Sequence, residues 1–397
     1  MNSRIPMTAR LLEKGQKRYL VGLLELACQQ LDITPAERTM ADERYTSVGQ
    51  WLADPSHAYL TNATIYTQGS IRIGTAIRPI GRNEFDVDLM CHLPGASTLT
   101  PQQVRDVVGN RLKSHGVYKN MLEPLRRGWR IVYANEFHLD ITPSIADPAH
   151  SSGGVLVPDR ELRDWKASHP KGYASWFETI AKREPGIAMA KSEVRADVEA
   201  MPDDIRFKGS LRRIVQIMKR HRDVWYAKKS AEERANAPIS IIITTLAAKA
   251  YARIATQQYD NALDLLLDVV DAMPSFIETR ITADGVEKWV INPMNEQENF
   301  ADKWRTHPER ALAFDTWLGA FKADLDQLAL EQGVDGLAKG LAGLLDENIS
   351  KAVLTEATRR LNVNRTSRTL VTGATGLISA ATSRTANAVP SNVFFGE

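Results

Sequence analysis

The chain has few cysteines, no excess charge of one sign and no long apolar run. Its 397 residues include only two cysteines, Cys28 and Cys91. Two distant cysteines exclude a disulfide framework or a zinc site, so we expect packing thiols in a reducing, cytoplasmic setting. The N-terminal stretch lacks the apolar core of a signal peptide, and no run of about eighteen apolar residues is long enough to span a bilayer, so we expect no membrane partner.

Positive and negative charges are almost balanced. The 50 Lys+Arg and 48 Asp+Glu residues leave a formal net charge of +2. Proteins that follow long nucleic acids do so through a strongly basic surface, so composition does not favour a long RNA or DNA track. A chain of this length is also long for one core, and we expect two closely packed lobes.

Local patterns predict where several helices and strands lie. Residues 7–31 carry leucines on one side and predict a long amphipathic helix. A second helix is predicted to begin at Thr34, because Pro35 suits the first helical position and Glu37 completes a T-x-x-E capping box. Residues 63–145 predict a strand-rich region that is interrupted by a helix at 101–115.

The second half of the chain changes character twice. Residues 146–175 are rich in Pro, Gly, Ser and His and predict a long connection over the core. From about residue 176 helical periodicity dominates. The helix predicted at 209–226 carries a cluster of basic residues. We expect four of them to lie on a solvated face, namely Arg212, Arg213, Arg220 and Arg222, and we treat Lys219 as the exception. After Arg360 small polar residues prevail, which predicts a mobile tail.

The most informative segment is IYTQGSIRIGTAIRPIGRNEFDVDLM at residues 65–90. Asp86 and Asp88 are separated by one residue, and alternate side chains of a strand share one face. The intervening and flanking apolar residues predict a half-buried strand. Carboxylates at this spacing suit two Mg²⁺ ions, which lie ~3.5–4 Å apart in two-metal sites. A solvated or calcium-binding acidic edge has the same pattern, so the interpretation needs support from elsewhere.

A third acid and a turn supply that support. In FHLDITP, Asp140 alternates with apolar residues and predicts a second half-buried strand, which would complete the metal cage. His138 shares that face, but Mg²⁺ prefers oxygen donors, so we expect His138 to lie next to the metal ligands or on the surface rather than to bind an ion. One predicted strand before the D-x-D, Gln68-Gly69-Ser70 forms a turn whose amides and hydroxyl suit a phosphate.

Other polar and aromatic residues near these motifs leave alternatives open. Arg72 and Thr75 follow the turn and suit either contact with a nucleotide or bonds to their own backbone. Three aromatic residues suit stacking on a purine or, as is more common at such spacing, packing between elements: Trp165, Tyr173 and Trp176.

Q-G-S, D-V-D and L-D-I in this order resemble the nucleotidyltransferase superfamily that includes DNA polymerase β and poly(A) polymerases. The spacing between Ser70 and Asp86 is longer than usual. The segment IRIGTAIRPIGRNEFDVD is similar to the bacterial cGAS-like enzymes, the CD-NTases, which make cyclic di- and trinucleotide signals in the CBASS anti-phage defence. Further similar stretches lie at 157–178, 211–225, 238–251 and 291–304, so the resemblance spans about residues 60 to 305.

The resemblance implies an α+β fold with a polymerase β-like nucleotidyltransferase core. That core, a mixed sheet with flanking helices, would pack on a C-terminal helical lobe to give a bilobed molecule. The implied divisions are 1–180 for the core with its long N-terminal helix, 181–361 for a helical lobe like that of oligoadenylate synthases, and 362–397 for a flexible tail.

The resemblance also implies residue roles. In the family a lysine on the helix that corresponds to 209–226 reaches the donor triphosphate, here Lys219, and a serine that opens the next helix supports it, here Ser240. The implied catalytic and metal residues are Asp86, Asp88 and Asp140, which would hold two Mg²⁺ ions, with Mn²⁺ as the alternative. The implied nucleotide-binding residues are Gln68, Gly69, Ser70, Arg72, Lys219 and Ser240.

The implied function is template-independent, two-metal joining of ribonucleoside triphosphates, ATP expected among them, into a cyclic di- or trinucleotide. Two alternatives stay open: a nucleotidyltransferase that extends RNA ends or a small acceptor, and a non-catalytic nucleotide sensor. Some family members are held by a regulatory partner through the C-terminus, and Phe394, Phe395 and Gly396 suit capture in a groove. Glu397 departs from a glycine-terminal tail, so conjugation through the C-terminus would require that Glu397 be removed.

Overall fold

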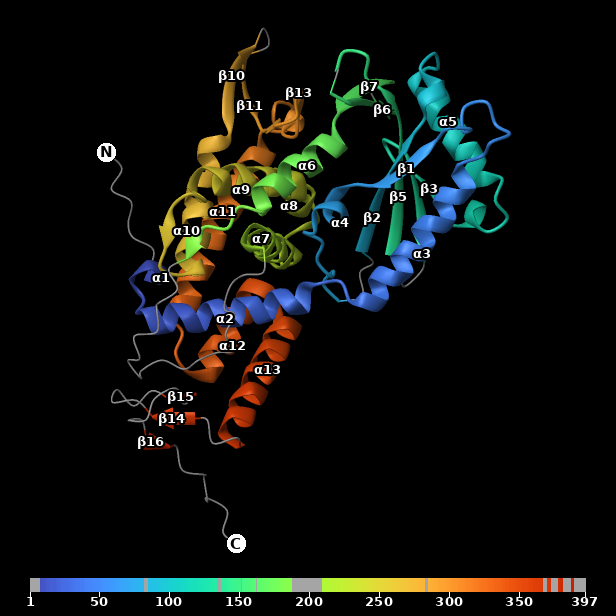
Figure 1. Cartoon of the computed structure of the whole chain (residues 1–397). Helices are drawn as coiled ribbons and strands as arrows, with labels where there is room; N and C mark the ends of the chain where they lie inside the picture. Colours follow the sequence, from blue (N-terminus) through green and yellow to red (C-terminus); the bar gives the residue numbers. More distant parts are fainter. Residues whose placement is uncertain are drawn as a thin grey trace.

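The computed structural model describes most of the chain as two packed lobes, one built on a sheet and one helical (Figure 1). The described residues are 8–81, 85–133, 137–150, 152–161, 163–187, 209–282 and 285–366, with the short segments 370–372, 378–380 and 387–388. The sequence-based prediction of an α+β fold, in which a mixed sheet packs on a helical lobe, is confirmed.

A seven-stranded mixed sheet organises the first lobe. Its path is β1-β2-β5-β4-β3, and β5 continues into a hairpin of β6 and β7. The parallel pair is β2 with β5, and the other neighbours are antiparallel. The strands are β1 (Thr64–Thr67), β2 (Phe85–His92), β3 (Leu122–Pro124), β4 (Trp129–Tyr133), β5 (Phe137–Ala146), β6 (Val155–Asp159) and β7 (Asp164–Ser168).

Alternation along β2 and β5 decides which face of the sheet is covered. Val87, Leu89, Leu139 and Ile141 are almost fully buried under α3 (Pro35–Leu52) and α5 (Pro101–Lys113). The acids of both strands therefore project from the opposite face. The predicted start of α3 is confirmed, since the Glu37 amide donates to Thr34 Oγ1 at 3.2 Å and the Thr34 amide donates to Glu37 Oε2 at 2.7 Å.

The helical lobe is built around α7, which its neighbours enclose on most sides (Figure 1). The N-terminal helix α2 and helix α6 also bury their apolar faces in this core, so a division of the chain at residue 180 does not separate the two cores. The helices of the lobe are α1 (Thr8–Leu11), α2 (Lys14–Leu31), α6 (Pro170–Ala181), α7 (Ser210–Ala227), α8 (Ala231–Ala235), α9 (Ser240–Ile254), α10 (Ala262–Ala272), α11 (Glu309–Leu330), α12 (Gly333–Leu345) and α13 (Glu347–Thr366).

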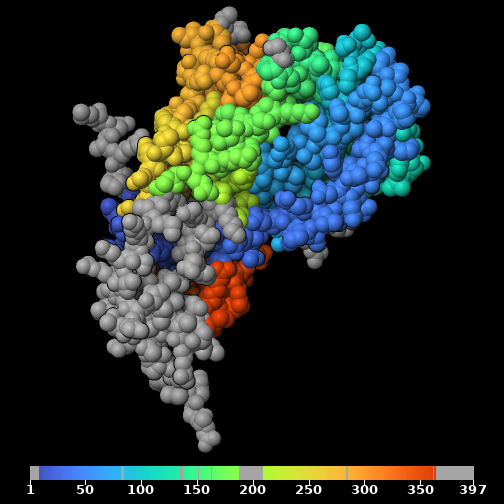
Figure 2. Space-filling view, in the orientation of Figure 1, coloured from blue at the N-terminus to red at the C-terminus, as the bar shows by residue number. Residues whose placement is uncertain are grey.

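The two lobes meet along α6, which lies at their junction in the space-filling view (Figure 2). In this lobe α6 packs against α7 and α9, and across the junction it packs against α4 (Gly69–Ile73), the short helix after β1. The turn predicted to bind phosphate is therefore held against the helical lobe.

Three expectations about local structure differ from the structure. The helix predicted at 7–31 is broken between α1 and α2, and the connection predicted at 146–175 holds the β6–β7 hairpin. The region after 176 also contains short strands: β8 (Gly186–Ile187), β9 (Gln258–Tyr259), β10 (Glu278–Thr282), β11 (Gly285–Trp289), β12 (Ile291–Asn292) and β13 (Asn295–Asn299). Strands this short owe their stability to pairing partners, which local periodicity does not reveal.

At the C-terminal end, α13 extends to Thr366, beyond the boundary expected at residue 361. A small antiparallel sheet follows, formed by β14 (Leu370–Thr372), β15 (Ile378–Ala380) and β16 (Asn387–Ala388). The predicted handle at Phe394, Phe395, Gly396 and Glu397 lies outside the described residues. Among the described helices, none combines the length and the apolar character that crossing a membrane requires.

Candidate active site

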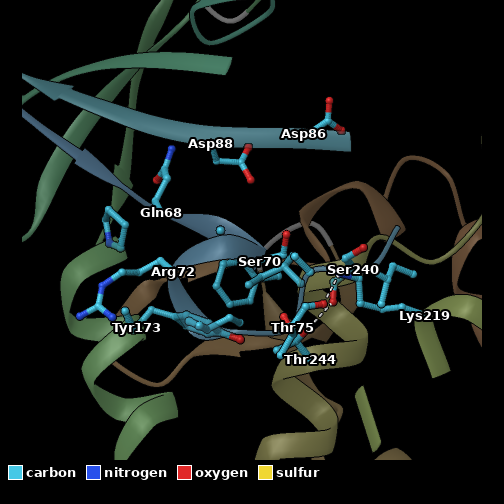
Figure 3. A pocket seen from close by; sticks show the side chains of 18 of the residues that line it. Gln68, Ser70, Arg72, Thr75, Asp86, Asp88, Tyr173, Lys219, Ser240 and Thr244 are labelled. Atoms are coloured by element: carbon cyan, nitrogen blue, oxygen red, sulfur yellow. Dashed lines mark hydrogen bonds between the residues drawn. The ribbon is translucent and has the colours of Figure 1, made fainter. Parts of the chain in front are cut away.

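A cavity of about 610 Å³ lies where the sheet lobe meets the helical lobe. Its walls come from β2, α4, α6, α7, α9 and the segment around β12 and β13. All six predicted nucleotide-binding residues and two of the three predicted acids line it (Figure 3), namely Gln68, Gly69, Ser70, Arg72, Asp86, Asp88, Lys219 and Ser240. The third acid, Asp140, is on the neighbouring strand and does not line this cavity.

The turn after β1 is in direct contact with one of the acids. Gly69 has a φ of 61°, in the left-handed region that favours glycine. A Cβ atom at Gly69 would lie 2.1 Å from Asp88 Oδ2, so only glycine lets the carboxylate approach this closely. The backbone N–H of Gln68 also donates to the backbone carbonyl of Asp88 at 2.8 Å, which fixes the turn to β2.

The three acids share the polar face of two parallel strands. The register pairs Asp88 with Asp140 and Asp86 with His138. Burial, together with the negative charges of Asp140 and Asp86, raises the pKa of Asp88 to about 7. A carboxylate with a raised pKa beside two others marks a place where a cation is strongly favoured.

One cation from this chain already lies among the acids. Arg130 is the β4 partner of Asp140, and its Nε and Nη2 donate to the two Asp140 oxygens at 2.6 and 2.7 Å. Nη2 also donates to Asp86 Oδ1 at 3.0 Å. The hydrogen bonds to Asp140, together with the negative charges of Asp140 and Asp86, raise the pKa of Arg130. Alternation along WRIVY puts Arg130 on the polar face of its strand. No sequence pattern indicates which acids it contacts, so Arg130 was not among the residues predicted from the sequence.

The predicted metal cage is not preassembled. Among the residues that the structure describes, no three Asp, Glu, His or Cys side chains converge on one ion. Arg130 and the ring of His138 contact Asp86, whereas the carboxylate of Asp88 lies toward the turn at Ser70 (Figure 3). The donor set itself fits Mg²⁺, since it offers carboxylate oxygens from paired positions of adjacent strands.

Helix α7 forms the opposite wall of the cavity. Lys219 is buried, its Nζ donates to the Thr75 carbonyl at 2.8 Å, and burial lowers its pKa to about 8. Arg222, which sequence analysis placed on a solvated face, lines the cavity and donates to Ser240 Oγ at 3.0 Å. The wall therefore carries two cationic side chains close to the serine predicted to support phosphate.

The predicted solvated basic face of α7 is wrong for two further residues. Arg220 is 1% exposed, and it donates to the Arg78 carbonyl at 2.5 Å and forms an ion pair with Asp346. Arg213 is also buried, and its Nη1 donates to Asp32 Oδ1 at 2.7 Å. Because α7 lies at the centre of the lobe, its arginines find carbonyl and carboxylate partners from surrounding segments.

A third wall holds a carboxylate that sequence analysis missed. Glu298 accepts hydrogen bonds from Asn292 Nδ2 at 2.7 Å and from Ser168 Oγ at 3.0 Å, and burial raises its pKa. Tyr173 also lines the cavity, although its hydroxyl is engaged with Thr245 Oγ1 at 2.9 Å. Trp165 and Trp176 pack against the two cores instead.

Known proteins resemble this chain in sequence and in fold. Residues 23–180 match the family model described as a Second Messenger Oligonucleotide or Dinucleotide Synthetase domain. A c-di-GMP synthase of Roseivirga ehrenbergii is 28% identical over 340 residues, which cover 84% of this chain and 86% of that protein. A cyclic AMP-AMP-AMP synthase of Acinetobacter sp. is 29% identical over 180 residues, which cover 43% of this chain and 50% of that protein.

Among solved structures, the Bradyrhizobium diazoefficiens CD-NTase CdnG in complex with GTP has a similar fold. The TM-score is 0.62 at 22% sequence identity, and the match covers 86% of this chain and 97% of that chain. Similarity at this identity establishes the architecture, whereas the site is argued from the residues of this chain.

Proposed function

Because this chain belongs to the CD-NTase family of nucleotidyltransferases, we propose that it joins ribonucleoside triphosphates into a cyclic di- or trinucleotide. One observation carries the proposal: the acidic face of β2, the turn at Ser70 and the buried Lys219 of the other lobe line the same cavity. A reaction that releases pyrophosphate needs these three elements together, namely acids for divalent ions, a phosphate cradle and a distant positive charge.

Each wall has a distinct task in this proposal. The Ser70 hydroxyl and the amides of its turn bind the phosphates of the donor nucleotide, and Lys219 and Ser240 stabilise the charge at their far end. Two divalent ions held by Asp86, Asp88 and Asp140 would lower the pKa of the acceptor ribose hydroxyl and stabilise the departing pyrophosphate. Asp140 is the proposed acceptor of the hydroxyl proton.

The carboxylate of Glu298 supports guanine as the base at the third wall. Asn292 uses its Nδ2 on Glu298 and its Oδ1 on the Met294 amide at 2.9 Å, so its amide is already satisfied. The carboxylate itself only accepts hydrogen bonds when ionised. Guanine offers two adjacent donors on its Watson–Crick edge, whereas adenine offers a donor beside an acceptor. A relative is named c-di-GMP synthase, and this name also supports GTP as a substrate.

A product assay tests this function. Incubation with Mg²⁺ and all four ribonucleoside triphosphates should yield a phosphatase-resistant cyclic product that contains guanine, and GTP alone should suffice, as read by mass spectrometry. Glu298→Gln replaces one acceptor by a donor and should lower the rate of product formation from GTP by about 10–100-fold. Glu296→Gln, an exposed neighbour on β13, is the matched control and should change nothing.

The other outcomes of the assay are informative. Extension of RNA or of a small acceptor would favour the first alternative, and binding without turnover would favour a sensor. A cyclic product without guanine would contradict the role of Glu298 but leave the synthase assignment intact.

Replacing Lys219 should weaken triphosphate binding in a pH-dependent way. Lys219→Met removes a charge-assisted contact, so affinity should fall by about 10–100-fold. Because burial lowers the pKa of Lys219 to about 8, the wild-type protein should lose affinity as pH rises above about 8, where the ammonium becomes neutral. Fluorescent-analogue titrations from pH 7 upward measure both effects. The Met variant should lack this pH dependence, and the exposed Lys351→Met control should retain it.

A further inference from the structure

Arg130 occupies the space between two acids that are proposed to share divalent ions. Its planar guanidinium donates hydrogen bonds to both oxygens of Asp140 and to one oxygen of Asp86, and so it bridges β5 to β2. The backbone ladder fixes this arrangement, because Arg130 and Asp140 are direct partners between β4 and β5. Such bidentate contacts have the geometry that a guanidinium and a carboxylate prefer.

The contact is also partly shielded from water. The side chains of Arg130 and Asp140 are 24% and 17% exposed, whereas that of Asp86 is 52% exposed. Asp86 Oδ1 accepts from Arg130 and also lies 3.2 Å from His138 Nδ1. A divalent ion that binds Asp86 and Asp140 together must therefore compete with a cation tethered to the protein.

We propose that Arg130 is a positioning residue that takes the place of a divalent ion in the nucleotide-free protein and thereby couples metal binding to triphosphate binding. The tethered charge neutralises part of the acidic cluster, so metal affinity is low until phosphate oxygens add ligands and negative charge. Coupling of this kind is reciprocal, so metal also tightens triphosphate binding. The inference rests on the proposed function, because it takes the three acids as metal ligands.

Mn²⁺ binding to the full-length protein tests the coupling without measuring turnover. The free Mn²⁺ signal in electron paramagnetic resonance gives the affinity with and without a non-hydrolysable GTP analogue. The analogue should raise the Mn²⁺ affinity of the wild-type protein by about tenfold or more. Arg130→Gln should bind Mn²⁺ about tenfold more tightly than the wild type without nucleotide, so the effect of the analogue should shrink.

Arg130→Lys gives a second, independent reading. It keeps the charge but loses the bidentate fork, so its Mn²⁺ affinity without nucleotide should lie between those of the wild type and the Gln variant. Arg359→Gln removes an exposed arginine on α13 and should leave Mn²⁺ affinity unchanged. Thermal melting establishes that each variant is folded before its affinity is interpreted.

The outcomes separate this inference from the proposed function. If neither Arg130 variant binds Mn²⁺ more tightly than the wild type, the coupling role is overturned. If instead a variant with Asp86 and Asp88 replaced binds Mn²⁺ as tightly as the wild type does, the acids are not the metal site. The proposed function then fails at that point.

Discussion

Replacing Asp86 and Asp88 together by asparagine is expected to abolish product formation. Both side chains line the cavity, and the proposed ions depend on them for charge and for position. Metal ions contribute several kcal/mol to the stabilisation of a phosphoryl-transfer transition state. Because about 1.4 kcal/mol corresponds to a tenfold change in rate, turnover should fall by about 10³-fold or more. Mass spectrometry of the product measures this loss.

The same double variant should remain folded, which distinguishes lost chemistry from lost structure. Asp86 is 52% exposed, and the raised pKa of Asp88 shows that burial disfavours its charge. A raised folded-state pKa means that metal-free wild-type protein loses stability as pH rises from about 4 to about 7. Asparagine at position 88 does not titrate, so thermal melts of the variant should lack that part of the decline.

An exposed acid provides the control for this result. Asp260→Asn removes a side chain that is 60% exposed and paired with Lys14, and Asp260 is not among the residues that line the cavity. It should keep wild-type turnover. Residual activity of the Asp86, Asp88 double variant within tenfold of the wild type would contradict the proposed mechanism.

Gly69→Ala is expected to have the second largest effect. The added Cβ would lie 2.1 Å from Asp88 Oδ2 and 2.8 Å from Asp88 Cγ, so the carboxylate or the turn must move. A displacement of about 1 Å near reacting groups costs roughly 10²-fold in rate. The φ of 61° adds backbone strain of about 1–3 kcal/mol for a residue with a side chain.

Gly81→Ala separates the contact from the strain. Gly81 has a φ of 70°, and a Cβ there would meet nothing within 4 Å. Gly81→Ala should therefore lose stability in thermal melts through backbone strain alone and keep its turnover, whereas Gly69→Ala should lose more stability and also lose turnover by about 10²-fold. Equal turnover in the two variants would mean that Asp88 does not need its contact with the turn.

Much of the site follows from local patterns in the sequence. Alternation predicted the faces of β2 and β5, because the period of a strand determines which side chains are buried. The capping residues Thr34 and Glu37 predicted the start of α3 for an equally local reason, since a cap bonds to amides within one turn. The order of Q-G-S, D-V-D and L-D-I gave the family, which the comparisons support independently.

The sequence by itself predicted the acids and the turn, because strand alternation and a short motif mark them, and the resemblance to the CD-NTases implied the role of Lys219 and the α+β class. Only the tertiary structure decided the partners. Arg130 meets Asp86 across 44 residues, and Lys219 meets the Thr75 carbonyl across 144 residues. The same holds for Glu298 in the third wall and for α2, which packs in the helical lobe rather than with the sheet that follows it. These contacts depend on strand order and on how the two lobes pack, and a local pattern carries no record of which distant segment will lie beside it.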